Sequence, residues 1–120
     1  MRFELVSLEQ CLHVQARLLR RLVAFSKQER DALLQKAEVP GLGPKLQRLH
    51  RQLSQAETLR RQAETRALGA GVGTADTRPD IALTLYRCRR LHGHVELLSR
   101  ELGHLQVQIS QAVRNARQAA

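Results

Sequence analysis

The chain has few of the residues on which mixed folds build their cores. Only 2% of its 120 residues are aromatic, with one Tyr, two Phe and no Trp. Hydrophobic residues make up 42% of the chain and are mostly Leu, Ala and Val, which with Arg, Gln and Glu form a helix-favouring composition. We therefore predict one small all-α domain with a modest core, whose stability would gain from a partner or a second copy.

Long apolar runs are also missing from the sequence. Charged residues and glutamines interrupt each run well before the roughly 20 apolar residues that a membrane-spanning helix needs. Arg2, Glu4 and Glu9 break the start of the chain, where a secretory signal peptide would have its apolar segment. We expect a protein that acts in the cytoplasm and does not insert into a membrane.

The chain has few residues that could form a catalytic or metal-binding site, and their spacing does not suit such a site. Cys11 and Cys88 lie among leucines without the paired spacing of a zinc site, so we expect reduced, packed thiols; whether they meet stays open. His92 and His94 would point about 200° apart on a helix and could not grip one ion. No nucleophile and base pair stands out, and the glycines of residues 69–73 lack the context of a phosphate-binding loop. We expect no metal, no cofactor and no enzymatic activity.

The few prolines and glycines divide the chain into helices. Residues 40–44 contain two prolines and two glycines, and residues 69–73 contain three glycines. Ser7 and Thr77 fit the start signals of helices, and an extension of the first helix by one turn over residues 1–6 is the alternative to a start at Ser7. The short first break predicts antiparallel neighbours, in an all-α antiparallel three-helix hairpin or bundle. The predicted helices span about residues 7–38, 44–68 and 78–118, with a flexible connector over 69–76.

The apolar residues of each predicted helix recur every three or four positions. The first stripe is broad, which suits a helix that faces two neighbours. The second helix has a single row, made of Leu46, Leu49, Leu53, Ala56, Leu59, Ala63 and Ala67. The third has a coiled-coil-like ladder that continues to the C-terminus. This ladder consists of Cys88, Leu91, Val95, Leu98, Leu102, Leu105, Ile109, Ala112 and Ala116.

The third predicted helix is longer than the second. Roughly 40 residues would reach about 60 Å at 1.5 Å per residue. Its C-terminal half would then either bend at Gly93 or Gly103 or project beyond the hairpin, exposing apolar residues to a partner. Packing of the same leucines on the other two helices is the alternative.

The charge is strongly positive, with 20 Lys and Arg against 11 Asp and Glu and a net charge of +9. Such a balance favours acidic protein surfaces, anionic membranes or nucleic acid, or forms a solvated surface with no partner. If the first two helices are antiparallel, Arg60 and Arg61 should come near Arg20 and Arg21. The chain has almost no aromatics for base stacking and no short recognition helix, which argues against specific nucleic-acid binding.

The first two predicted helices contain a recognisable pattern of residues. It consists of the segment Phe25-Ser26-Lys27-Gln28-Glu29-Arg30-Asp31-Ala32-Leu33-Leu34 and, after a break, of Leu46, Leu49, Leu53, Ala56, Glu57, Arg60 and Arg61. This pattern resembles that of the FlgN-like flagellar export chaperones. A Gly-containing break and a long third helix follow in both. This chain differs in its basic balance and in its stiffer break at Pro40 and Pro44.

The resemblance implies a cytoplasmic chaperone that holds hook–filament junction (hook-associated) proteins before type III export, with the C-terminal third binding the client. On that basis we predict an apolar seam with a basic rim that orients acidic client residues. The seam consists of Val95, Leu98, Leu102, Leu105 and Ile109, and the rim of Arg100, Arg114 and Arg117. Further partners in this interpretation are the export apparatus and a second copy of the chain. The alternative function is that of a basic coiled-coil adaptor or stalk protein, which binds nucleic acid or an acidic protein surface.

Overall fold

The computed structural model describes residues 2–37, 39–69 and 79–119, and side chains within 3–37, 39–69 and 81–118. These residues form three α-helices and no strand: α1 (Arg2–Leu34), α2 (Leu42–Gly69) and α3 (Pro79–Ala119). The predicted all-α fold is confirmed. Thr77 and most of the predicted connector lie outside the described residues.

The first helix begins and ends earlier than predicted. It starts at Arg2, so Ser7 lies inside it and is not its cap. It ends at Leu34, because Lys36 adopts a left-handed conformation with φ of 54°. The amides of Lys36 and Ala37 donate to the carbonyls of Leu33 and Ala32, which is the Schellman arrangement that closes a helix C-terminus.

The second helix begins two residues before Pro44. Gly41 has a φ of 74°, which favours glycine, and its carbonyl accepts the first helical hydrogen bond from Lys45. Pro44 lies in the first turn of α2, where a backbone N–H would lack an intrahelical partner anyway. The proline that was expected to mark the helix start is therefore accommodated within it.

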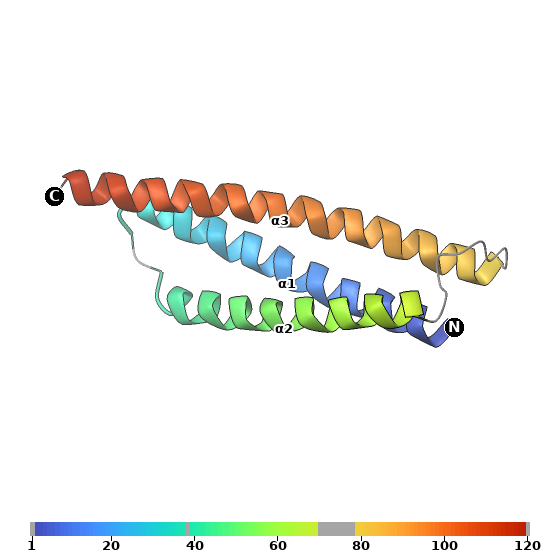
Figure 1. The fold of residues 1–120 in the computed structure, drawn as a ribbon. Coiled ribbons are helices and arrows are strands. Elements are labelled where there is room, and N and C mark those ends of the chain that lie inside the picture. Colours follow the sequence, from blue (N-terminus) through green and yellow to red (C-terminus); the bar gives the residue numbers. More distant parts are fainter. Residues whose placement is uncertain (1, 38, 70–78, 120) are drawn as a thin grey trace.

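Helix α1 is the central element of the bundle (Figure 1). It packs against both α2 and α3, as the breadth of its apolar stripe predicted. Successive helices run antiparallel, so α1 and α3 run parallel. Their register is constant: Arg87 bonds Glu9 and Arg30 bonds Gln108, and both pairs are 78 residues apart.

That register shows why the expected overhang is wrong. The same offset places Leu34, the last residue of α1, opposite Ala112, so only the last two turns of α3 extend past α1. The prediction compared α3 with the shorter α2, but α3 lies along α1, which has 33 residues. The molecule is 62 Å long, and α3 spans that length as one helix, unbroken at Gly93 and Gly103.

The core consists of apolar residues, most of them leucines, from α1, α2 and α3. In α1 the buried apolar residues are Leu5, Leu12, Ala16, Leu19, Leu22 and Val23. In α2 they are Leu42, Leu46, Leu49, Leu53, Ala56, Ala63 and Ala67. In α3 they are Ile81, Cys88, Val95, Leu98, Leu102 and Leu105. At one end, Leu5, Ala67 and Ile81 form a small separate cluster.

One residue of the predicted α2 row lies outside this core. Leu59 is 54% exposed, and the half-buried Arg60 occupies the next position of the three-and-four spacing between Ala56 and Ala63. The three-and-four spacing of the buried α2 row therefore includes Arg60, and Leu59 lies beside this row.

Within the described ranges, no helix is both long enough and apolar enough to cross a bilayer.

Candidate partner-binding surface

The predicted client seam lies inside the bundle. Val95, Leu98, Leu102 and Leu105 are between 3% and 9% exposed, and all belong to the main core cluster with α1 and α2 leucines. Ile109 is half-buried near the end of α1. The expectation that these residues project beyond the hairpin is wrong, because the parallel α1 covers them along almost their whole length. In this state they are not a free surface.

The predicted basic rim is exposed. Arg100, Arg114 and Arg117 are all accessible on α3, and none has an ion pair in the part of the chain that the structure describes. Arg117 lies in the final turns, past the end of α1. The rim residues thus remain available to a partner, although the seam they were expected to surround does not.

A second row of α3 residues carries the exposed apolar surface instead. Leu83, Tyr86, Leu97 and Val107 are each more than half exposed. They share spacings of three, four or seven with exposed basic residues, and therefore lie on one face of the helix, turned away from the core. We call this face the outer ridge; it consists of Leu83, Tyr86, Arg90, Leu97, Arg100, His104, Val107 and Arg114.

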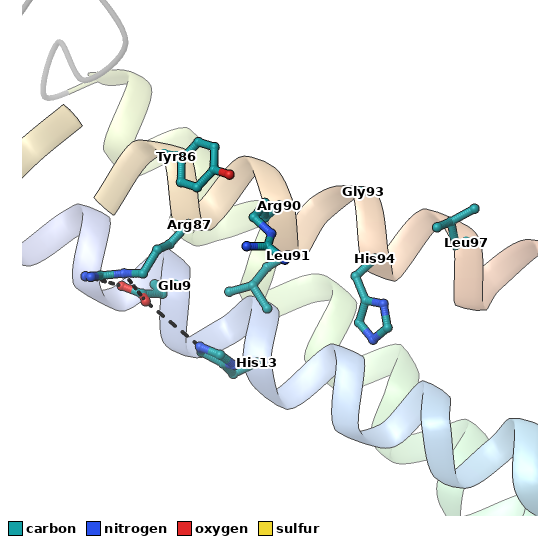
Figure 2. Close-up of a pocket in the computed structure, with 9 residues that line it drawn as sticks. All are labelled: Glu9, His13, Tyr86, Arg87, Arg90, Leu91, Gly93, His94 and Leu97. Atoms are coloured by element: carbon teal, nitrogen blue, oxygen red, sulfur yellow. Dashed lines mark hydrogen bonds and ion pairs between the residues drawn. The ribbon is translucent and has the colours of Figure 1, made fainter. Parts of the chain in front are cut away.

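The outer ridge borders an open groove between α1 and α3, of about 570 Å³ (Figure 2). Leu91 and His94 point from α3 toward α1, while Tyr86 and Leu97 point outward. Glu9 and His13 supply the α1 side. The remaining α3 lining residues are Arg87, Arg90 and Gly93.

Polar contacts hold one end of this groove together. Arg87 Nε donates to Glu9 Oε1 at 2.9 Å, and Arg87 Nη2 reaches Glu9 Oε2 at 3.4 Å and Thr84 Oγ1 at 3.4 Å. His13 Nε2 lies 3.9 Å from Glu9 Oε1. Because the Glu9 side chain is only 16% exposed, this ion pair is better shielded from solvent than a typical surface pair. Arg90 has no described ion-pair partner and faces the groove.

Gly93 forms a gap in the middle of the outer ridge. A Cβ atom added there would meet no other atom within 4 Å, so packing within the molecule does not require glycine. Glycine in a helix interior is about 0.5–1 kcal/mol less favourable than alanine. Gly93 therefore leaves a notch between Arg90 and Leu97 on this face of α3, which a partner side chain could enter.

The cysteines are both free thiols and lie in different surroundings. Cys88 is buried, and its Sγ donates a long hydrogen bond of 3.9 Å to the Leu5 carbonyl. Burial raises the pKa of the Cys88 thiol from 9.0 to about 11, and the negative charge of Glu9 adds to the rise. Cys11 is half-buried at the edge between α1 and α2. Cys88 is therefore protonated at neutral pH and acts as a packing residue.

The arginine clusters meet differently from the sequence expectation. Leu59 lines the same hollow as Cys11 and Val14, so the neighbouring Arg60 does not lie beside Arg20 or Arg21. The structure instead brings Arg21 together with Lys45 and Arg48. The antiparallel arrangement of α1 and α2 was predicted correctly. The residues that face each other across these two helices differ from those expected for a turn centred on Pro40.

Histidines and acids do not cluster in the ranges described. No group of three or more His, Cys, Asp or Glu side chains there could hold a metal ion. His92 pairs with Glu96, one turn further along α3 and away from His94.

Comparison of the chain with protein-family models, curated proteins and solved structures found no match. The described residues form a three-helix bundle, and α3 exposes the outer ridge on its surface.

Proposed function

We propose that this protein is a chaperone or adaptor that binds an amphipathic helical segment of a partner protein along the outer ridge and the adjoining groove. The observation that carries the proposal is the row of four apolar side chains, each more than half exposed and placed at helical spacing on α3. Exposed apolar rows of this kind are what a partner helix packs against.

Charge on the outer ridge indicates the kind of partner. Arg90, Arg100 and Arg114 alternate with its apolar residues, and the ridge contains no acid. A second copy packed on this face would bring arginines toward arginines, which disfavours self-association through it. A helix that alternates apolar residues with Asp or Glu would complement it.

The particular partner we propose follows from the resemblance to the FlgN-like chaperones. It is the C-terminal helical segment of a hook–filament junction protein, held in the cytoplasm before export. In this proposal the partner binds the third helix, as the resemblance implied. The binding face is the exposed outer ridge instead of the buried seam, and Arg100 and Arg114 remain contacts.

The test is calorimetric titration of the full chain with that C-terminal segment at low and high salt. We expect binding that survives high salt, because apolar contacts are not screened. Leu97→Ser should weaken it about tenfold, as truncation of a central interface residue does. Leu68→Ser is the matched control, since Leu68 is an exposed leucine of α2, 73% accessible, outside this surface.

Equal losses in the two variants, or no loss in either, would contradict the proposed site. Absence of binding at both salt concentrations would contradict the flagellar partner.

The net charge of +9 favours nucleic acid as a second candidate partner. The affinity of the protein for nucleic acid would depend on phosphate contacts and would fall steeply as the salt concentration rises. Titration with duplex DNA under the same two conditions separates the candidates, because Leu97→Ser should leave phosphate binding unchanged.

A further inference from the structure

The edge between α1 and α2 carries a surface that the proposed function does not use. At one end, Arg21, Lys45 and Arg48 surround an open hollow of about 220 Å³, with Phe25 and Leu49 in its wall. Gln52 completes the lining, which contains no carboxylate. Three cations therefore meet over an apolar wall with no acid among them.

These cations are available to a ligand. Among the described residues, Arg21, Lys45 and Arg48 make no ion pair. The Lys45 ammonium lies 5.7 Å from the centroid of the Phe25 ring, a cation–π contact that holds its stem beside the hollow. Convergent, unneutralised cations next to an apolar wall would stabilise a carboxylate carried on an apolar chain.

The same edge continues into an apolar slot. Cys11, Val14, Ala56 and Leu59 line a hollow of about 130 Å³, with Gln10 at its margin. Val14 and Leu59 are 46% and 54% exposed. The slot also accounts for Leu59, which departs from the buried row of α2 and has no role in the core.

The two hollows lie in line. The α1 residues Cys11, Val14, Arg21 and Phe25 follow the spacing of three, four or seven that keeps side chains on one face of a helix. The fourteen positions from Cys11 to Phe25 span about 21 Å at 1.5 Å per residue. The two hollows therefore lie along one edge of the bundle, and we call this edge, with its cationic hollow and its apolar slot, the α1–α2 groove.

We infer that this α1–α2 groove binds an acidic segment of a protein partner, with its carboxylates on Arg21, Lys45 and Arg48 and an apolar side chain in the slot. The distribution of charge along the groove indicates which kind of partner it would bind. The cations gather at one end and the other end is apolar, whereas a nucleic acid needs cations that follow its backbone. The inference does not rest on the function proposed for the outer ridge.

The test uses the full chain and a fluorescent peptide with two adjacent glutamates and a leucine roughly six residues further along, which matches the groove length at about 3.4 Å per extended residue. Fluorescence anisotropy measures its affinity. The double variant Arg21→Gln and Arg48→Gln should weaken binding about 2- to 30-fold, the combined effect of two solvent-accessible ion pairs. Leu59→Ser should weaken it by a smaller factor, and Leu97→Ser on the outer ridge should not change it.

The control variant removes the same charge from elsewhere on α2. Arg61→Gln with Arg66→Gln alters exposed arginines near the far end of that helix and should leave the affinity unchanged. All the replaced side chains are exposed, so helical content measured by circular dichroism should be that of the parent protein. Lys45→Ala alone provides a second, milder variant of the cationic end.

Three results would overturn the inference: no binding of the peptide, equal losses from the two arginine double variants, or equal affinity for a peptide with glutamines in place of the glutamates. Tighter binding of a DNA oligonucleotide, weakened alike by both double variants, would also overturn it in favour of a diffuse polyanion surface.

Discussion

At the scale of single residues, Gln15 is a buried polar side chain with an unpaired hydrogen-bond acceptor. It is 2% exposed in the middle of α1, and its Oε1 accepts no hydrogen bond. A buried acceptor without a donor destabilises a fold by about 1–3 kcal/mol. Gln15 follows the same three-and-four spacing as the buried Leu12 and Leu19, so its position on the helix buries it despite its polar amide.

We predict that Gln15→Met raises the free energy of unfolding by about 1 kcal/mol, because methionine has a similar shape and no unpaired acceptor. Urea denaturation followed by circular dichroism measures the change. Gln28→Met, at an exposed position of the same helix, should alter stability by less than about 0.5 kcal/mol. A destabilised Gln15→Met protein would mean that the amide makes a hydrogen bond in solution.

Cys88 gives a pH dependence whose sign follows from its burial. Its folded-state pKa is raised from 9.0 to about 11, so the folded protein holds this proton more tightly than the unfolded chain. The stability from this thiol is fully present below about pH 9 and is lost as the pH rises toward 11, by up to about 2–3 kcal/mol.

Denaturation of the parent protein and of Cys88→Ala at several pH values between about 8 and 11, a range that includes the raised pKa of the Cys88 thiol, checks this prediction. The variant should be less stable at neutral pH and should lose less stability over the alkaline range. Parallel curves for the two proteins would show that other groups cause the loss.

At the scale of elements, α3 is a helix with glycines that its own packing does not need. A Cβ atom would meet nothing within 4 Å at either Gly93 or Gly103. We predict that Gly93→Ala and Gly103→Ala each stabilise the protein by about 0.5–1 kcal/mol through higher helix propensity. Thermal unfolding measures both changes, and a loss of stability in either would mean that α3 bends there in solution.

The same pair of variants separates stability from binding. Gly93 lies in the notch of the outer ridge, and Gly103 lies off the ridge. If a partner side chain enters the notch, only Gly93→Ala should weaken binding, although both variants are stabilised.

At the scale of the whole molecule, the bundle depends on the parallel contact between α1 and α3. Lys27 and Glu101 form an ion pair of 3.0 Å in that contact, and Leu102, one residue further along, is 6% exposed in the core. A charge at Leu102 would face the leucines of α1 without a partner. The two helices run side by side over most of their length, so disruption at this point should spread through the bundle.

We predict that Leu102→Asp destabilises the protein by more than about 4 kcal/mol and abolishes the folded state, because it creates a cavity and buries a charge. Leu97→Asp, five residues earlier and 63% exposed, should retain the fold. Circular dichroism and thermal unfolding distinguish the two. A folded Leu102→Asp protein would show that α3 can leave α1, which would restore the buried seam as a candidate client site.

The helices of this protein were predictable because their causes are local. Periodic leucines, the prolines at 40 and 44 and the glycines near 70 mark elements whose existence depends on a few neighbouring residues. Their ends were less predictable: α1 stops at Leu34 because Lys36 takes a left-handed conformation, which residue type alone does not favour. The outer ridge was also readable as a second series of three-and-four spacings, but the stronger core ladder drew the prediction to a face that the bundle buries.

Composition and spacing alone determined that this chain is helical, that α1 has two neighbours, and which residues of α3 form a continuous apolar ladder. Only the tertiary structure decided what covers that ladder. Val95 and Leu105 have the same pattern whether they meet α1 or a partner, because periodicity specifies a face of a helix and not its occupant. The parallel register of α1 and α3 buries that face, whereas the outer ridge and the α1–α2 groove are exposed.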